Sequence, residues 1–526
     1  MYPGPALAAA LRATTLETAR TPGRYDALVI GGGAAGGLSA LSLTEAGLRV
    51  LVLEAGAIRS PLRSFSRRLT RGLTRRILGP AALAALDRRR HKIQTQCYAW
   101  PFASEAFVDD LDCPYVTPPD RPFVWLRARQ LGGRWVIPGH GRQQYRLGSN
   151  DLAPPDGLSL PWPLQMGELD PWYAAVERRL GIAGRRDNLP WLPDSELSSV
   201  IEPTAAESAL QRSITARWPS AHPVLRRLSA PFDFLEAAAK TGRLLIRPGA
   251  IAREIEVGRS GRVSGVIWID QRTHTEQRAS APLVFLCASA LESTRLLLLS
   301  RSSQNSEGLG ATSGVLGRCL MDHVWVQMRG KGPTLPAGSL PEHRHYLYLP
   351  RFDARNSPAP VEGRGFGVQV LQISAGEEGS RFVVDSFAEM LPRPENRVTL
   401  DAKRRDAWGI PVLHIDCRHG DAELAQAREQ VLALRELAEV AGVELTQIDK
   451  APRPPGMAIH ECGTARMGSD PTSSVLDPYN ECWEARGLYV TDSACFPSQG
   501  TQNPTLTILA LTARACDHAL RAAPAS

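Results

Sequence analysis

The chain has 526 residues, more than one compact domain usually contains, so we expect two domains or one domain with large insertions. Its content of 43% apolar and 22% charged residues is typical of a globular protein, and no run approaches the ~20 apolar residues that a membrane helix needs. Nine scattered cysteines without metal-like spacing favour reduced thiols, so we expect a cytoplasmic protein with neither a disulfide framework nor a metal site.

The N-terminal region predicts a dinucleotide site. Residues 1–21 lack the pattern of a signal peptide and could form a loose arm. A buried strand at Ala27–Ile30 then leads into Gly31-x-Gly33-x-x-Gly36, a helix follows to Ala46, and a second strand from Val50 ends at Glu54. Gly31 permits the tight turn, Gly33 lets the backbone approach a pyrophosphate, and Gly36 lets helix and strand pack closely. Glu54 can accept from both ribose hydroxyls, which argues against NADP but leaves FAD and NAD open.

The net charge of +7 is concentrated in the next segment. Between Arg59 and Lys92 the chain carries ten arginines and one lysine against one acid, Asp87. Apolar residues recur there at near-helical spacing and predict a basic amphipathic helix: Leu62, Phe65, Leu69, Leu73 and Ile77. We interpret residues 57–92 as a surface helix or a lid, with membrane-surface contact as a less favoured alternative. Nucleic-acid binding is not expected, because aromatic residues do not alternate with the arginines.

The middle of the chain adds a glycine loop, a further strand–helix unit and an antiparallel sheet. The loop is RARQLGGRWVIPGHG at residues 127–141, in which backbone at Gly132 and Gly133 could lie close to a flat ligand. A strand at 282–287 precedes a helix at 290–300. Between Cys319 and Leu400 polar and apolar residues alternate, which predicts an antiparallel sheet that forms a wall of a substrate cavity. A long amphipathic helix is predicted at 421–441.

Near the C-terminus, HECGTARMG begins at His460, and a strand ending before Asp492 leads to a helix over 505–520. We expect Asn503 to cap this helix and Pro504 to occupy its first turn. The positive potential at such a helix start suits a flavin, whose reduced ring carries negative charge.

Taken together, these motifs resemble the glucose-methanol-choline family of flavoprotein oxidoreductases over nearly the whole chain. The carrying segments are the N-terminal glycine unit with Glu54, GGRWVIPGHG, ALESTRLLLLS, His460-x-x-Gly463-Thr464 and Asn503-Pro504-Thr505. The resemblance is strongest to the branch with pyranose oxidase and the large subunits of gluconate and sugar dehydrogenases. It implies an α/β fold: a Rossmann-like FAD-binding domain from residues 22–155, 235–318 and 455–526, and a substrate domain with an antiparallel sheet from 156–234 and 319–454.

The resemblance also implies site residues. His460 would take the hydroxyl proton of an alcohol while hydride leaves to flavin N5, and Asn503 would hydrogen-bond the same hydroxyl; a histidine suits the base and an amide does not. The expected FAD contacts are Gly31, Gly33, Ala34, Ala35, Gly36, Glu54, Gly132, Gly133, Ala252, Asp492, Pro504 and Thr505. Some relatives attach FAD through a histidine where this chain has Ile137, so we expect non-covalent FAD. We expect His140 to pack or to bond a carbonyl, and His323 to be structural. Ser289 departs from the pattern, because many relatives have glycine at this place in the strand-to-helix turn.

The predicted activity is FAD-dependent oxidation of a CH–OH group on a small-molecule alcohol: a sugar, a polyol, or a glycosylated or aminosugar metabolite. Oxygen or another acceptor would reoxidise the flavin. Two alternatives remain: oxidation of a hydrophobic alcohol at a membrane surface, and a non-redox lyase on the same fold. Bleaching of the flavin by substrate would separate the oxidoreductase from the lyase.

Overall fold

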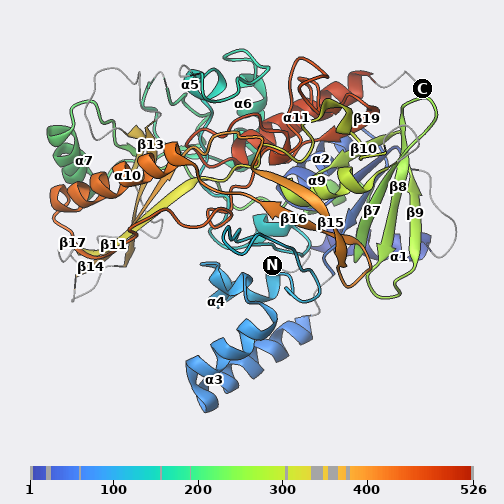
Figure 1. The fold of residues 1–526 in the computed structure, drawn as a ribbon, viewed down its shortest axis with the longest axis horizontal. Coiled ribbons are helices and arrows are strands. Elements are labelled where there is room, and N and C mark those ends of the chain that lie inside the picture. Colours follow the sequence, from blue (N-terminus) through green and yellow to red (C-terminus); the bar gives the residue numbers. More distant parts are fainter. Residues whose placement is uncertain are drawn as a thin grey trace.

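A computed structural model of the chain describes residues 4–18, 25–57, 61–154, 157–189, 191–301, 306–332, 347–352, 365–374 and 379–522. The molecule is elongated, with two sheets toward opposite ends of its long axis (Figure 1). It has the predicted mixed α/β fold, with one mainly parallel sheet and one antiparallel sheet.

The first sheet has six strands in the order β18-β19-β10-β1-β2-β6. Their bounds are β18 (Glu481–Cys482), β19 (Ala485–Val490), β10 (Leu283–Leu286), β1 (Ala27–Ile30), β2 (Val50–Glu54) and β6 (Leu244–Pro248). All neighbours are parallel except the edge strand β18. Every residue of β1, β2 and β10 is buried, as expected for strands covered on both faces. Segments far apart in the chain therefore build one nucleotide-binding type of sheet.

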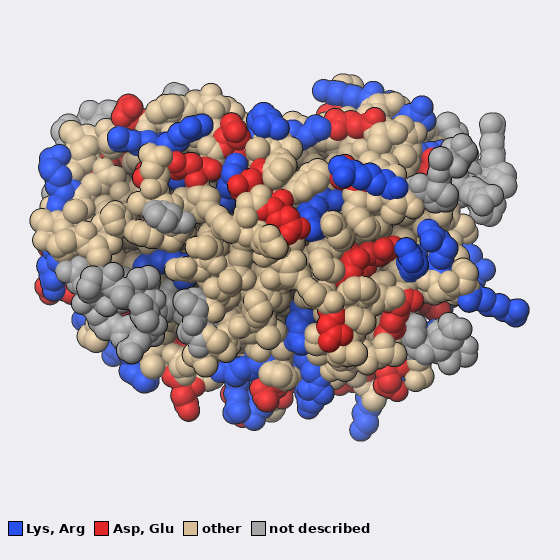
Figure 2. Space-filling model, turned by 90° about the horizontal axis from the view of Figure 1, so that it is seen from above, with Lys and Arg blue, Asp and Glu red and all other residues tan. Residues whose placement is uncertain are grey.

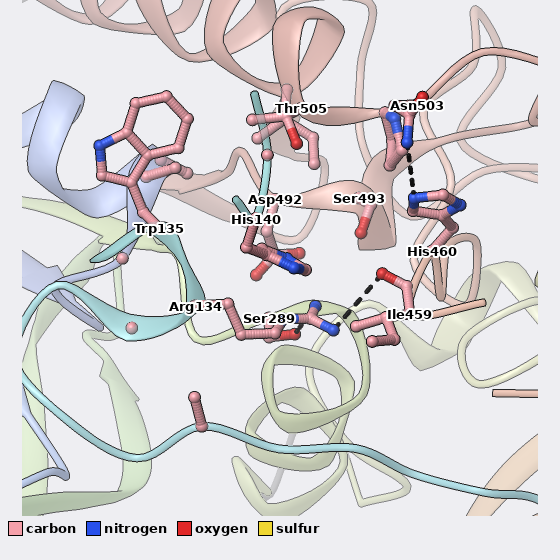
Figure 3. A pocket seen from close by; sticks show the side chains of 18 of the residues that line it. Arg134, Trp135, His140, Ser289, Ile459, His460, Asp492, Ser493, Asn503 and Thr505 are labelled. Carbon is pink, nitrogen blue, oxygen red and sulfur yellow. Dashed lines mark hydrogen bonds between the residues drawn. The ribbon is translucent and has the colours of Figure 1, made fainter. Parts of the chain in front are cut away.

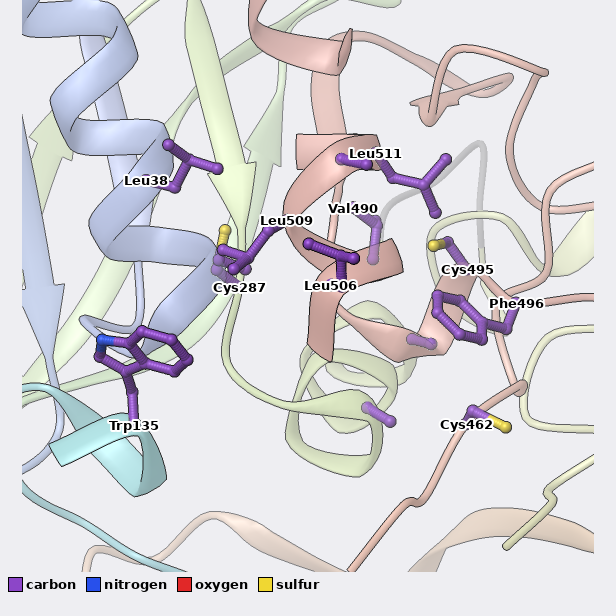
Figure 4. Packing of buried hydrophobic residues seen from close by; sticks show 14 of the residues in the cluster. Leu38, Trp135, Cys287, Cys462, Val490, Cys495, Phe496, Leu506, Leu509 and Leu511 are labelled. Carbon is purple, nitrogen blue, oxygen red and sulfur yellow. The ribbon is translucent and has the colours of Figure 1, made fainter. Parts of the chain in front are cut away.

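Helices and a small sheet cover the six-stranded sheet. Helix α2 (Ala34–Glu45) packs on β1, β2 and β10, and it also contacts α8 (Phe234–Ala239) and α11 (Thr505–Ala522). Figure 4 shows apolar side chains of α11, including Leu506 and Leu509, directed toward Leu38 of α2 and Val490 of β19. The sheet of β7 (Ala250–Val257), β8 (Val263–Asp270) and β9 (Glu276–Ser280) contacts β10 and β19. Helix α9 (Ala290–Leu299) follows β10, as predicted.

The N-terminal residues are not a loose arm, so this expectation was wrong for the part of the segment that the structure describes. Pro5–Thr18 form helix α1, which buries Leu7 and Leu11. The Thr14 hydroxyl accepts the backbone N–H of Ile246 on the edge strand β6 at 2.8 Å. The Glu236 carboxylate accepts the backbone N–H of Leu7 at 2.9 Å. The helix forms because it covers an open sheet edge, which no local sequence signal announces.

The second sheet is antiparallel, with the order β17-β11-β14-β13-β12-β5. Its strands are β17 (Glu444–Ile448), β11 (Val324–Gly332), β14 (Ser380–Ala388), β13 (Phe366–Ser374), β12 (Leu347–Phe352) and β5 (Val224–Leu225). Helix α10 (Asp421–Val440) packs on β11, β14 and β17, so one face of the sheet is covered. A hairpin of β15 (Arg397–Arg405) and β16 (Pro411–Asp416) contacts α9.

Further helices and two short strands complete the described part of the chain. They are α3 (Pro61–Arg90), α4 (Trp100–Ala103), α5 (Ser149–Leu152), α6 (Asp170–Leu180), α7 (Ala205–Arg217), β3 (Ala183–Gly184) and β4 (Ser199–Val200). Helix α3 is the predicted basic helix; it projects from the body (Figure 1), is interrupted at Gly79 (φ 81°), and leaves Leu69, Leu73 and Ile77 exposed. No helix within the described residues is both long and apolar enough to span a bilayer.

Candidate active site

A cavity of about 1670 Å³ lies between the two sheets. One end of its wall is formed by the carboxyl ends of β1, β2 and β10, including Ile30 and Cys287. The other end is formed by side chains of β11, β13 and β14. A ligand-binding crevice outside the carboxyl ends of parallel strands is the general arrangement of open α/β sheets.

The glycine turn at one end of the cavity fits a pyrophosphate. Gly31 has φ 94°, and a Cβ at Gly36 would lie 1.8 Å from the Gly31 carbonyl oxygen, so both positions require glycine. A Cβ at Gly33 would meet no protein atom within 4 Å, so this backbone faces the open cavity. No side chain caps α2 at Gly33, which leaves the amides of its first turn available to an anion.

Glu54, at the end of β2, fits a ribose with free hydroxyls. Its Oε2 accepts the Gly32 N–H at 2.8 Å and its Oε1 accepts the Gly56 N–H at 2.6 Å. Each oxygen retains a lone pair for a hydroxyl donor. Burial raises the pKa of the Glu54 carboxyl, while the Gly56 and Gly32 amides and the Arg129 charge oppose the rise. The residues present therefore fit the adenosine part of a dinucleotide.

The structure places most of the expected cofactor contacts on the cavity wall. The residues that line it are Gly31, Gly33, Ala34, Ala35, Glu54, Gly133, Ala252, Asp492, Pro504 and Thr505. Gly36 and Gly132 do not line it: Gly36 packs against Gly31, and Gly132 (φ 85°) makes the turn beside Val136. Asp492 accepts a hydrogen bond from the Ser293 hydroxyl, and burial raises the pKa of its carboxyl to about 6.

His460 and Asn503 meet at the far end of the cavity. The Asn503 Nδ2 lies 3.1 Å from the His460 Nε2, and both side chains line the wall (Figure 3). Gln369 of β13 donates from Nε2 to the Asn503 Oδ1 at 3.0 Å. This oxygen is therefore bonded to the antiparallel sheet, and the role of Asn503 as the cap of α11 stays a prediction. Pro504 directly precedes the first residue of α11, Thr505.

Asp322 holds the loop that carries His460. Its carboxylate accepts the backbone N–H groups of Gly456 at 2.7 Å, Ala458 at 3.1 Å and His460 at 3.1 Å. Between them, Ile459 adopts φ 63°, a left-handed conformation that a β-branched residue rarely takes. Sequence reasoning missed Asp322, although its place directly before His323 was a usable signal.

Burial keeps His460 neutral. The pKa of His460 is lowered well below its usual value by burial first, then by His323, His140 and the Arg134 charge. His140 also lines the cavity, and burial with the charges of Arg134 and Arg142 lowers its pKa to about 3. Its Nδ1 lies 3.2 Å from the Tyr98 hydroxyl, so its recorded partner is a phenol rather than the expected carbonyl.

Arg134 connects its own loop to two other segments beneath the pair. It donates to the Glu461 carboxylate at 3.1 Å. It also donates to the Ile459 carbonyl at 3.4 Å and to the Ser289 hydroxyl at 3.3 Å (Figure 3). Ser289 has φ 79°, the conformation for which glycine is favoured. The contact with Arg134 gives this serine a role that a glycine could not supply.

Comparisons with known proteins agree with this architecture. The chain matches the family model described as GMC oxidoreductase over residues 392–512 and that described as FAD binding domain over residues 26–63. It is 26% identical to the paromamine 6'-oxidase of Streptomyces fradiae, covering 95% of this chain and 91% of that protein. It is 25% identical to the 2-methyl-1,2-propanediol dehydrogenase of Mycolicibacterium austroafricanum (94% and 95%) and 25% identical to the fructose dehydrogenase large subunit of Gluconobacter japonicus (94% and 97%).

The fold is similar to that of solved enzymes. The crystal structure of a pyridoxine 4-oxidase from Mesorbium loti superposes with a TM-score of 0.62 at 19% identity, covering 95% of this chain and 100% of that one. With an FAD-binding segment, a GMC oxidoreductase segment and relatives along nearly its full length, the chain is similar to the glucose-methanol-choline (GMC) family of FAD-dependent oxidoreductases.

Proposed function

We propose that the protein oxidises a CH–OH group of a sugar, polyol or glycosylated metabolite to a carbonyl, with His460 as the base and Asn503 as the residue that orients the hydroxyl. The observation that carries the proposal is the 3.1 Å pair of His460 Nε2 and Asn503 Nδ2 on a cavity that also contains the glycine turn and Glu54. An alcohol between these two side chains would accept from the amide and donate to the imidazole.

The cofactor site is assigned to residues of the six-stranded sheet and α11. The turn from Gly31 to Gly36 would hold the pyrophosphate, Glu54 the ribose, and the start of α11 at Thr505 the flavin. FAD, when bound, supplies the acceptor for the hydride that leaves the alcohol carbon. Ile137 is buried and does not line the cavity, which supports non-covalent FAD. Acid denaturation should then release the flavin into the supernatant; colour retained in the precipitate would contradict this assignment.

A polar row on the antiparallel sheet supports a substrate with several hydroxyls. Gln327 of β11, Asp385 of β14 and Gln369 of β13 lie directly opposite one another in register, and all three line the cavity. Neighbouring strands are ~4.8 Å apart, so the row offers hydrogen-bonding groups at intervals comparable to the hydroxyls across one sugar ring. The Asp385 Oδ1 accepts from Trp325 Nε1 and Gln327 Nε2, both at 2.8 Å. Both of these bonds end on Oδ1, so we assign the second oxygen to a substrate hydroxyl. Burial raises the pKa of the Asp385 carboxyl, while the two hydrogen bonds and the charges of Arg453 and Arg226 oppose the rise.

The test is an anaerobic panel of sugars, aminosugars, polyols and simple alcohols, read by bleaching of the flavin absorbance. Bleaching by a sugar or polyol supports the proposal, and subsequent mixing with air or a quinone identifies the class of acceptor. Consumption of a substrate without bleaching would indicate lyase chemistry. A protein that binds no FAD would refute the proposed function.

A second candidate is oxidation of a hydrophobic alcohol at a membrane surface. It is favoured by the exposed Leu69, Leu73 and Ile77 of α3, which follow one another at spacings of four residues on one helix face. Residues outside 59–92 carry 50 basic and 53 acidic side chains, so this segment carries the whole positive excess. On the face in Figure 2, basic and acidic side chains are interspersed. Binding to phosphatidylglycerol vesicles that is lost in Leu73→Glu, with long-chain alcohols as better substrates than sugars, would establish this candidate instead.

A further inference from the structure

His323, which the sequence suggested to be structural, contacts the proposed base directly. It precedes β11 and is 1% exposed. Its Nδ1 lies 2.7 Å from the Nδ1 of His460, and its Nε2 lies 3.1 Å from the Gly500 carbonyl oxygen. The two rings are nearly perpendicular, with centroids 4.8 Å apart. Residues 137 positions apart in the chain thus form one pair, in which His323 is buried and His460 is partly buried.

The contact with Gly500 determines the direction of both hydrogen bonds. A carbonyl oxygen can only accept, so the His323 Nε2 carries a hydrogen and donates. Burial lowers the pKa of His323 to about 4, so its ring is neutral at pH 7 and its Nδ1 has a lone pair and no hydrogen. The 2.7 Å contact then requires His460 to donate from Nδ1. In a neutral His460 the Nε2 is consequently free of hydrogen.

The hydrogen bonds on the other side of His460 agree with the same tautomer. Gln143 donates from Nε2 to the Gln369 Oε1, and Gln369 donates from Nε2 to the Asn503 Oδ1 at 3.0 Å. The Asn503 group that faces His460 is therefore the amide nitrogen, which only donates. It points at the His460 Nε2 from 3.1 Å, and this contact is a hydrogen bond only if that nitrogen is an acceptor. The contacts of His460 with His323 and with Asn503 thus agree on one tautomer, which has its hydrogen on Nδ1 and none on Nε2.

We propose that His323 is a positioning residue that holds His460 in the tautomer with a bare Nε2 and stabilises the imidazolium formed in the reaction. This inference rests on the proposed function. When the alcohol O–H bond breaks, its proton forms the Nε2–H bond of His460 and its electron pair stays on the substrate oxygen. The ring then carries a hydrogen on both nitrogens, and the Nδ1–H remains bonded to the His323 Nδ1. Without that acceptor, a buried donor would lack a partner in the ground state and in the imidazolium.

Two substitutions of His323 distinguish the effect of its hydrogen-bond acceptor from the effect of its imidazole ring. In His323→Asn the side-chain oxygen can replace Nδ1 as an acceptor, although it cannot be protonated. In His323→Leu no acceptor remains. An unpartnered buried donor costs ~1–3 kcal/mol, so we expect His323→Leu to slow anaerobic flavin reduction about 10- to 100-fold and His323→Asn to restore most of the rate. His419→Leu is the control, because His419 is a partly buried histidine whose pKa burial likewise lowers to about 4, and it does not line the cavity.

The tautomer is also measurable without turnover. In the ¹⁵N-histidine NMR spectrum of the FAD-loaded protein, His460, assigned by its loss in His460→Asn, should show a protonated Nδ1 and an unprotonated Nε2. A protonated Nε2 in the parent protein would overturn the inference, and so would a parental reduction rate in His323→Leu or an equally slow His323→Asn. A general structural effect would instead slow His419→Leu as well, which would also overturn it. His460→Ala in the same assay tests the proposed function separately: if it reduces flavin at the parental rate, the base itself is wrongly assigned.

Discussion

Asp385 provides a test of how the sheet selects the substrate. In Asp385→Asn the side-chain oxygen can still accept from Trp325 Nε1 and Gln327 Nε2, while the second carboxylate oxygen becomes an amide nitrogen that cannot accept. The fold of the wall is thereby retained and one charged acceptor is removed. Hydrogen bonds to charged groups contribute ~1.5–3 kcal/mol, so the dissociation constant of a sugar substrate should rise about 10- to 150-fold.

The assay is anaerobic stopped-flow reduction of the flavin over a range of substrate concentrations. We expect the half-saturating sugar concentration to rise while the limiting rate changes little, because Asp385 contacts neither His460 nor Asn503 in the recorded bonds. A simple alcohol that fills only the His460 end should be unaffected. Asp449→Asn is the control. Asp449 accepts hydrogen bonds from the Gln327 backbone N–H and from Arg453 beside Asp385, but it does not line the cavity. The substitution should change the half-saturating sugar concentration by no more than about twofold. A fall in the limiting rate at unchanged half-saturation would refute the role of Asp385 in recognition.

Four further outcomes are expected. Glu54→Ala removes the acceptor for the ribose hydroxyls at a cost of ~1–3 kcal/mol, so FAD should bind about 10- to 100-fold more weakly in equilibrium dialysis; unchanged retention would exclude this role. His460→Ala should slow flavin reduction about 10²–10⁴-fold and Asn503→Ala about 10–10³-fold, with FAD retained in both, as absorbance spectra will show. Burial, His323, His140 and Arg134 all lower the pKa of His460, and only the neutral ring accepts a proton. The rate of flavin reduction should therefore be constant from pH 7 to 9 and fall only below about pH 6.5. A midpoint of the pH profile above pH 7 would contradict this. Gly36→Ala would place a Cβ 1.8 Å from the Gly31 carbonyl oxygen, so α2 must shift and both thermal stability and FAD retention should fall, whereas Gly72→Ala on α3, with no atom within 4 Å, should change neither.

Local signals in the sequence were sufficient for the nucleotide end of the cavity. The turn at Gly31 and Gly36 is specified by contacts between residues five positions apart, and Glu54 follows at the end of the next strand. The parallel strands could be predicted because strands buried on both faces are continuously apolar. The antiparallel strands could be predicted because polar and apolar residues alternate along them with a period of two. His460 and Asn503 were identified by family motifs, and their proximity followed from the same resemblance.

Only the tertiary structure showed the other hydrogen-bond partners of His460 and Asn503. His323 lies 137 positions from His460, and Gln369 lies 134 positions from Asn503. The row of Gln327, Asp385 and Gln369 exists only because the register of three strands places these residues opposite one another. No spacing along the chain encodes such contacts, since the register depends on the whole hydrophobic pattern of the sheet and on its turns. The sequence by itself predicted most of the helices and strands and led to the proposal of His460 and Asn503 as the reacting side chains. The packing of the two sheets determined the hydrogen-bond partners of these two side chains, and therefore the chemistry that we propose for them.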